Sequence, residues 1–547
     1  MDRPLAFRFV ALVDRAKTPR SLQCHLGGSC LRLLRRSSKR GKQNACCCCC
    51  CLGPEAPDKV RSSHIDEVDT KITPHDGGVD AASPTSRGEE NAKIATATSL
   101  SGATNMLDQM RQIFTFAGPA LGIWLSGPIM SLIDTSVIGT SSSLELAALG
   151  PGTVLCDGLS YLFMFLSVAT SNLIATSLAH KDRDAAANHL ARLLFVALAC
   201  GVGMLVISEL SSSSVLRLFV GEKNLALVPA AASYVNIRAL AWPVVLLGMV
   251  AQSASLGMQD SWSPLKALLV ASVVNGAGDV LLCTFLGYGI AGAAWATSLS
   301  QYVAGFLMLK ALKAKDYDPL AVAVPRMKDL ALMIEITAPL LLTMLSKVCF
   351  YTAITYFATS LGAITLGAHQ VMVGLFILFS VCGEPLGQTA QSFMPELISG
   401  RNRDIKQAQT LLRSLLVTGA VFGLALAITG GSVALLAPQL FTKDSAIVKQ
   451  MHSLLLPFFW SILVTPSTLA VEGTLLAGRD YKYLGFGTAC CFACGSVFML
   501  LFHKLGFGLN SCWWILFLFL SARFGLSFSR LISSKSILRS ASSIYST

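Results

Sequence analysis

Charged side chains are scarce in most of this 547-residue chain. Only 14% of the residues are Asp, Glu, Lys or Arg, whereas 53% are hydrophobic. Between Gln112 and Leu144, Asp134 is the only charged residue. So low a charge content outside the first hundred residues excludes an ordinary soluble domain and is typical of a polytopic membrane protein.

The sequence also lacks the common motifs of enzymes and metal sites. It has no His-Glu-x-x-His, Gly-x-Ser-x-Gly or paired-aspartate prenyl-transfer motif, so an intramembrane enzyme is disfavoured and we predict no catalytic residue. The 17 cysteines show no metal-ligand spacing, and six of them are consecutive at Cys46–Cys51. We interpret this run as low-complexity sequence, with palmitoylation or metal capture as alternatives, and predict no bound metal.

Apolar runs long enough to cross a bilayer dominate the chain after residue 110. A spanning helix needs roughly 20 mostly apolar residues, and about twelve runs qualify. The boundary between the seventh and eighth runs is the least clear, because no charge lies between Lys347 and His369. The runs lie near 113–137, 153–178, 189–209, 232–258, 266–286, 290–312, 330–358, 366–396, 411–438, 447–475, 482–503 and 511–533.

The net charge of +12 does not indicate nucleic-acid binding, because the basic residues follow the loops. The even-numbered loops between predicted helices carry 15 Lys and Arg, and the odd-numbered loops and their margins carry six. This asymmetry orients membrane proteins, so we expect no nucleic-acid partner and place both termini on the basic side of a lipid bilayer.

The first hundred residues divide into two segments of different composition. Residues 1–51 hold 11 Lys and Arg but only two acids, which is typical of an organelle transit peptide. Composition alone does not separate plastid from mitochondrion, and a disordered cytosolic tail is the alternative. Residues 52–110 are rich in acidic and small polar residues and predict a disordered linker.

An internal repeat divides the membrane part in two. AGPALGIWLSG at 117–127 resembles TAPLLLTMLSK at 337–347, and KDRD at 181–184 resembles RNRD at 401–404, both 220 residues apart. Near the end of each half the offset is 219, where LGYGIAGAAW at 286–295 resembles LGFGLNSCWW at 505–514. GYGIAG at 287–292 therefore predicts a turn between helices, not a dinucleotide site.

We therefore predict an all-α membrane protein of about twelve transmembrane helices in two pseudo-symmetric six-helix bundles. An even number of helices per half makes the halves parallel, and such repeats commonly place a substrate site between them. The expected segments are a first bundle at 111–315, a loop at 316–328, a second bundle at 329–533 and a tail at 534–547.

Two acids at bilayer depth stand out in the first half, since buried charges are costly and normally face a bundle interior or a cavity. Asp279 lies 13 residues after Lys266, with Asn275 one helical turn before it. Asp279 and Asp134 could share a proton, because burial favours the protonated form of a carboxylic acid. Alternatively, the two carboxylates could hold a sodium ion. A purely structural role, with each acid satisfied by neighbouring hydroxyls or amides, is the alternative.

The second half supplies candidate substrate contacts. Lys347 could pair with Glu384 or attract an anion, and a lysine reaching to the bilayer surface is the alternative. Pro385 should kink its helix, and Glu472, seven residues before Arg479, could reach the surface instead of a site. The candidate set is Lys347, Tyr351, Glu384, Gln388, Gln391, Glu472 and Gln252, which is the repeat partner of Glu472.

The strings SLIDTSVIG, NGAGDVLL, GEPLGQTAQSFMPE and EGTLLAGRDYKY resemble the multidrug and toxic compound extrusion (MATE) family of cation-coupled antiporters, and more narrowly its plant plastid-envelope branch. The resemblance covers residues from about 110 to 530. It implies that Asp134 and Asp279 form the cation site, as acids on helices one and five do in bacterial relatives. Other branches carry glutamates on helix seven, where this chain has Lys347 and no acid.

The resemblance implies a proton- or sodium-coupled antiporter that functions as a monomer without a further cofactor. Its expected partner is a small organic solute, an aromatic acid such as salicylate or its precursor, exported across the plastid envelope. Another organelle membrane is the alternative location. A lipid or oligosaccharide flippase of related two-bundle architecture is the alternative function.

Overall fold

The computed structural model describes residues 106–139, 143–220, 222–318, 323–401, 403–442 and 444–533, with Ser536 and Leu538. These residues belong to the unit Ser83–Thr547. The predicted transit peptide at 1–51, the Cys46–Cys51 run and most of the predicted linker and tail lie outside them.

The described part of the chain is helical and contains no strand. The first half comprises α3 (Met106–Gly139), α4 (Ser143–Leu162), α5 (Met164–Ala179), α6 (Arg183–Val220), η3 (Glu222–Leu227), α7 (Val228–Ala239), α8 (Trp242–Gly257), α9 (Trp262–Asp279), η4 (Val280–Phe285) and α10 (Gly289–Lys313). The second half comprises α11 (Met327–Ser360), α12 (Ala363–Val381), α13 (Glu384–Ser399), α14 (Ile405–Leu436), η5 (Pro438–Leu440), α15 (Ser445–Ser453), α16 (Leu455–Ala477), α17 (Tyr481–Lys504) and α18 (Leu509–Ile532).

Every predicted apolar run coincides with one helix or with helices joined end to end, so the all-α two-bundle fold is confirmed. Ten helical stretches among the described residues are long and apolar enough to cross a membrane. An eleventh is the pair Leu225–Ala239 and Trp242–Gly257, which is bent by 54°. The remaining run coincides with α10, which is not among the stretches that pass this test.

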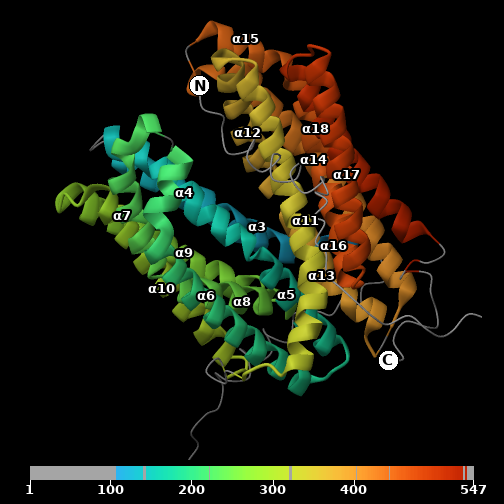
Figure 1. Cartoon of the computed structure of the whole chain (residues 1–547). Coiled ribbons are helices and arrows are strands. Elements are labelled where there is room, and N and C mark those ends of the chain that lie inside the picture. The colour runs from blue at the N-terminus through green and yellow to red at the C-terminus, as the bar shows by residue number, and fades with distance from the viewer. Residues whose placement is uncertain are drawn as a thin grey trace, which may run out of the picture. The chain divides into compact units, whose positions relative to one another are not determined.

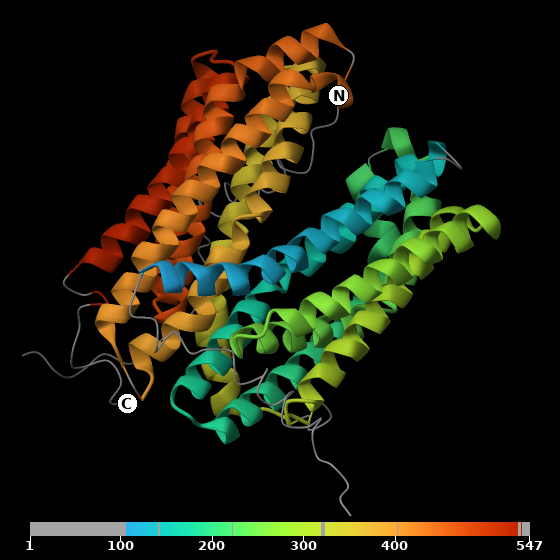
Figure 2. The same ribbon diagram turned by 180° about the vertical axis from the view of Figure 1, so that it is seen from behind.

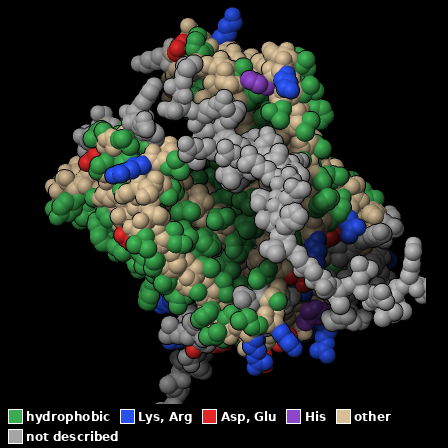
Figure 3. Space-filling model, viewed as in Figure 1, with side chains coloured by type: hydrophobic (Ala, Val, Ile, Leu, Met, Phe, Trp, Pro, Cys, Tyr) green, Lys and Arg blue, Asp and Glu red, His purple; other side chains and the backbone are tan. Residues whose placement is uncertain are grey.

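The two halves form separate helix bundles (Figures 1 and 2). Hydrophobic side chains cover much of the face seen in Figure 3, and Lys and Arg gather mainly at its lower end. Many large apolar side chains on the bundle flanks are exposed, including Leu210, Phe285 and Phe306. An exposed apolar flank with cations at the ends suits a lipid bilayer.

Helix α3 joins the two bundles through contacts near its beginning. Gln109 Oε1 accepts a hydrogen bond from Ser414 Oγ of α14 at 3.4 Å. The rings of Phe116 and Phe393, the latter on α13, meet edge to face with centroids 5.2 Å apart. The far end of the same helix carries Asp134 inside the first bundle, so α3 connects the bundle interface to the acid.

Breaks within the helices occur where sequence chemistry predicts them. The helix is interrupted near Pro385: α12 ends at Val381, and Pro385 lies in the first turn of α13, where a missing N–H costs least. The predicted turn at GYGIAG lies at its first two residues, between η4 and α10, with positive φ at Gly287 (68°) and at Gly289 (53°), the first residue of α10.

Candidate functional site

The first bundle brings Asp134 and Asp279 together. Asp134 is on α3, and Asp279 is the last residue of α9, immediately before the π-helical segment η4. Their residues are 4% and 0% exposed, and the two acids are close enough for the charge of Asp134 to act on Asp279. A π-helical segment changes the direction in which nearby side chains point and frequently marks a functional position in a helix.

Few donors satisfy these carboxyl groups. Thr297 Oγ1 of α10 lies 3.3 Å from Asp134 Oδ2 but only 2.8 Å from the carbonyl oxygen of Ala293. Because a hydroxyl has one hydrogen, the closer carbonyl competes with the acid for it. Among the described residues, Asp134 Oδ1, Asn275 Oδ1 and both carboxyl oxygens of Asp279 have no hydrogen-bond partner.

This arrangement fits a small cation. Two ionised carboxylates in contact repel each other, and burial without donors makes each charge costlier. A proton shared between Asp134 and Asp279, or a sodium ion between them, removes both penalties. The carboxylate oxygens of the two acids, the amide oxygen of Asn275 and the hydroxyl oxygen of Thr297 are the kinds of ligand that a hard cation prefers. The described residues contain no group of three or more His, Cys, Asp or Glu that could hold a metal ion.

The first bundle also contains a cation that the sequence analysis did not single out. Arg238 on α7 donates a hydrogen bond from Nη1 to Tyr234 Oη at 2.9 Å. Its charge acts on both Asp134 and Asp157.

The second bundle holds a buried network of three charged residues. Lys347 Nζ of α11 lies 3.1 Å from Glu472 Oε2 of α16. Arg523 of α18 donates from Nε to Glu472 Oε1 at 2.9 Å and from Nη2 to Oε2 at 2.8 Å. Arg523 is a further functional candidate that our sequence analysis missed, although it lies within an apolar run whose only other charged residue is Arg530.

Two possibilities that the sequence left open for these residues differ from the structure. Glu472 does not reach the surface beside Arg479: its side chain is only 5% exposed and binds two cations. The hydrogen-bond partner of Lys347 is Glu472 and not Glu384. Only the pairing of Glu472 with Arg479 was suggested by spacing along the chain. The partners of Glu472 come from α11 and α18, which a single sequence does not reveal.

Aromatic and acidic groups surround the network. Glu384, at the start of α13, lies within electrostatic reach of Lys347, Glu472 and Arg523. Tyr351, one turn after Lys347, interacts with Arg523, whose guanidinium also lies 5.3 Å from the ring centroid of Phe519. Tyr161 interacts with the same charges although it is on α4 of the first bundle. The network therefore faces the junction of the bundles.

The predicted glutamines occupy different positions. Gln388 Nε2 donates to Ser171 Oγ of α5 at 2.9 Å, so it links the two bundles. Gln391 donates to the carbonyl of Gly387 on its own helix at 3.3 Å. Gln252 is half-buried on α8. The Gln388–Ser171 hydrogen bond must change if the bundles move apart, so it resembles a gate more than a substrate wall.

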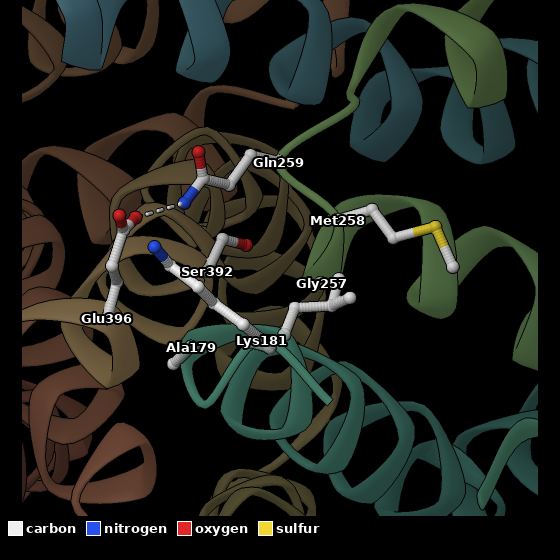
Figure 4. A pocket seen from close by; sticks show the side chains of 9 residues that line it. Ala179, Lys181, Gly257, Met258, Gln259, Ser392 and Glu396 are labelled. Atoms are coloured by element: carbon white, nitrogen blue, oxygen red, sulfur yellow. Dashed lines mark hydrogen bonds between the residues drawn. The ribbon is translucent and has the colours of Figure 1, made fainter. Parts of the chain in front are cut away.

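The loops at one end of the bundles enclose a cavity of about 230 Å³ (Figure 4). Gln259 Nε2 donates to Glu396 Oε2 at 3.3 Å, and the Lys181 side chain extends toward the same carboxylate. Nearby, the Arg401 amide donates to the carbonyl of Ala179 at 3.1 Å. These contacts join predicted even-numbered loops, so the bundles are held together at the basic end.

Asp260 fixes the loop beside this cavity. Its carboxylate lies 2.5 Å from Lys315 Nζ and accepts hydrogen bonds from the amides of Trp262 and Ser263 at 3.0 Å each. Burial opposes ionisation of Asp260, but Lys315 and these donors together lower the pKa of the carboxyl group below its ordinary value. The loop that carries Gln259 is thus anchored to the end of α10.

Two helix bundles of this arrangement, each with buried charges, define a membrane transporter of the two-bundle type. The MatE family pattern matches this chain twice, at residues 119–281 and 339–501. The chain belongs to the MatE family and is a transporter, not an enzyme.

Curated relatives share most of the chain. Protein DETOXIFICATION 47, chloroplastic, from Arabidopsis thaliana is 49% identical over 79% of this chain and 80% of its own length. Protein DETOXIFICATION 44, chloroplastic, from the same plant is 28% identical over 75% and 80%. The DNA damage-inducible protein F of Escherichia coli is 27% identical over 48% of this chain and 58% of its own.

Solved structures share the fold. A MOP superfamily transporter from Pyrococcus furiosus superposes with a TM-score of 0.69 at 19% identity, covering 77% of this chain and 94% of its own. A structure described as MATE in the bent conformation gives the same TM-score and identity and covers 78% and 96%.

The two family matches begin and end 220 residues apart, which confirms the repeat. At this offset Asp134 corresponds to Ile354, and Asp279 corresponds to Met499. Both are buried apolar residues, 2% and 5% exposed. The acid pair therefore has no counterpart at the equivalent positions of the second bundle.

Proposed function

We propose that this chain is a proton- or sodium-coupled antiporter that exports a small aromatic acid, such as salicylate or its precursor, across the plastid envelope. The observation that carries the proposal is that Asp134 and Asp279 are both buried in the first bundle, where the charge of one acts on the other. A cation bound there would favour one arrangement of the bundles, and the solute would favour another. Differential binding of this kind is the thermodynamic requirement for antiport.

The division of charge between the bundles supports an anionic solute. The acid pair of the first bundle suits the coupling cation, whereas Lys347 and Arg523 of the second bundle offer two positive groups beside Tyr351. A carboxylate would find charge and aromatic surface together, and such a charge contact is stronger in a low-dielectric site than in water. Glu384 lies near the same charges at the junction of the two bundles. Gln388 bridges this junction through its hydrogen bond to Ser171.

Lys347→Ala should weaken transport of an aromatic acid about tenfold, the equivalent of one charge-assisted hydrogen bond. Glu472 keeps Arg523 as a partner, so the variant should still fold. The measurement is salicylate flux into proteoliposomes, with the neutral salicylamide as the comparison. Equal loss for both compounds would remove Lys347 from solute recognition.

The proposed location rests on two independent features. Residues 1–51 are basic and poor in acids, and two of the relatives named above are described as chloroplastic. Deleting residues 1–51 should leave transport intact and mislocalise the protein in the cell. A fluorescent protein fused after residues 1–110 should enter plastids. A fusion that stays in the cytosol would contradict the transit-peptide interpretation.

Flux in reconstituted vesicles tests the function as a whole. Purified protein in proteoliposomes should move salicylate when a proton or sodium gradient is imposed, and it should not do so without one. Exposure of lipid headgroups on both leaflets, with no solute flux, would favour a flippase instead.

A further inference from the structure

Glu472 occupies the position that a transported carboxylate would need. It accepts three hydrogen bonds from two cations, one from Lys347 and two from Arg523. The guanidinium binds it through Nε and Nη2, a two-point geometry that suits any carboxylate. Both cations are committed to this one acid, so a solute that uses them must replace Glu472.

We infer, building on the proposed function, that Arg523 and Lys347 form the carboxylate-binding site of the transported acid and that Glu472 is its internal competitor. Arg523 is the principal anchor, because its fork presents two parallel donors while Lys347 contributes a single one. Lys347 alone does not form the site.

The residues around Arg523 and Lys347 could accommodate an aromatic acid in place of Glu472. The junction that the network faces receives Tyr161, which is 40% exposed, from the first bundle. Tyr351 and Phe519 place aromatic rings beside the guanidinium, and Phe519 stacks on Phe350 with centroids 3.9 Å apart. An aromatic acid would therefore meet ring faces where its carboxylate meets Arg523.

The acids beside Lys347 and Arg523 explain how a bound solute carboxylate can leave these two cations. Lys347 and Arg523 face two acids, Glu472 and Glu384, within electrostatic reach. When a solute carboxylate leaves, Glu472 can take its place, so the two cations are never left buried without a partner. An uncompensated buried charge is strongly unfavourable, and the internal acid avoids that penalty at release.

A matched set of variants of the full chain separates this role from a merely structural ion pair. Equilibrium dialysis with labelled salicylate and with salicylamide gives both affinities, and thermal unfolding reports folding of each variant. Glu472→Gln removes the competitor, so it should tighten salicylate binding about tenfold and leave salicylamide unchanged. Arg523→Gln should weaken salicylate binding by a similar factor, and Arg523→Lys should restore part of it.

The double variant Arg523→Gln with Glu472→Gln keeps the charge balance and should fold even where a single variant does not. It should bind salicylate about tenfold more weakly than the single Glu472→Gln variant, with salicylamide unaffected. Salicylate binding in this folded double variant as tight as in Glu472→Gln overturns the inference, as does equal change for both ligands in any folded variant. A wild type that binds no aromatic acid instead contradicts the proposed function itself.

Discussion

Replacing Asp279 with asparagine should reduce gradient-driven flux to the level of vesicles without protein. Asparagine keeps the size and hydrogen-bonding capacity of the side chain but cannot titrate. It also removes one of the two carboxylates that would hold a sodium ion. The variant should fold normally, because an uncharged side chain is easier to bury beside Asp134 than a second acid. Flux in proteoliposomes and thermal unfolding in detergent measure the two expectations separately.

Glu335→Gln is a suitable control for this substitution. Glu335 is also an acid on a helix of the membrane part, but its side chain is 59% exposed and pairs with Lys482 at 2.6 Å. Exposed ion pairs contribute little, so flux and stability should both stay near the wild-type values. Wild-type flux in the folded Asp279→Asn variant would assign Asp279 a packing role and remove it from coupling.

Adding one methyl group at Gly473 should lower the free energy of unfolding by about 1–3 kcal/mol. Gly473 follows Glu472 on α16, where this helix packs closely against α13. A Cβ atom there would lie 2.8 Å from Gly387 Cα and still closer to its carbonyl oxygen. Backbone atoms cannot rotate away, so the two helices must separate, and Glu472 would shift with them.

Gly431→Ala in α14 provides the comparison, because a Cβ atom at that position would meet no heavy atom within 4 Å. Alanine is favoured over glycine inside a helix by roughly 0.5–1 kcal/mol, so this variant should be as stable as the wild type or slightly more so. Thermal unfolding of the Gly473→Ala and Gly431→Ala variants under the same condition compares their stabilities. Equal stability would show that α13 and α16 do not depend on the glycine contact.

The helices and their pairing into two halves could be predicted from the sequence because they depend on local composition and on a repeat. Runs of apolar residues and the 220-residue offset are properties of the chain itself. The ends of the helices were less predictable, since α3 begins at Met106, seven residues before the apolar run that predicts it. A helix continues past the hydrophobic stretch where polar residues can still form its backbone hydrogen bonds.

The acid pair could be anticipated and the charged network could not. Asp134 and Asp279 each stand out in an apolar run, and their rarity identifies them without any knowledge of contacts. Lys347, Glu472 and Arg523 also stand out singly, but their partnership depends on how α11, α16 and α18 pack. Helix rotation about its own axis decides which of these side chains meet, and one sequence does not specify that rotation.

Solute flux against two separately imposed gradients tests the central claim most directly. Wild-type protein and the Asp279→Asn variant are reconstituted in parallel with protein-free vesicles, because protonated aromatic acids cross bilayers unaided. The membrane potential is clamped, and labelled salicylate is followed under a proton gradient and then under a sodium gradient. The account predicts that one gradient drives protein-dependent flux opposite to the cation and that the variant shows none. Salicylate flux that ignores both gradients, or transport of organic cations without any acid, would contradict it.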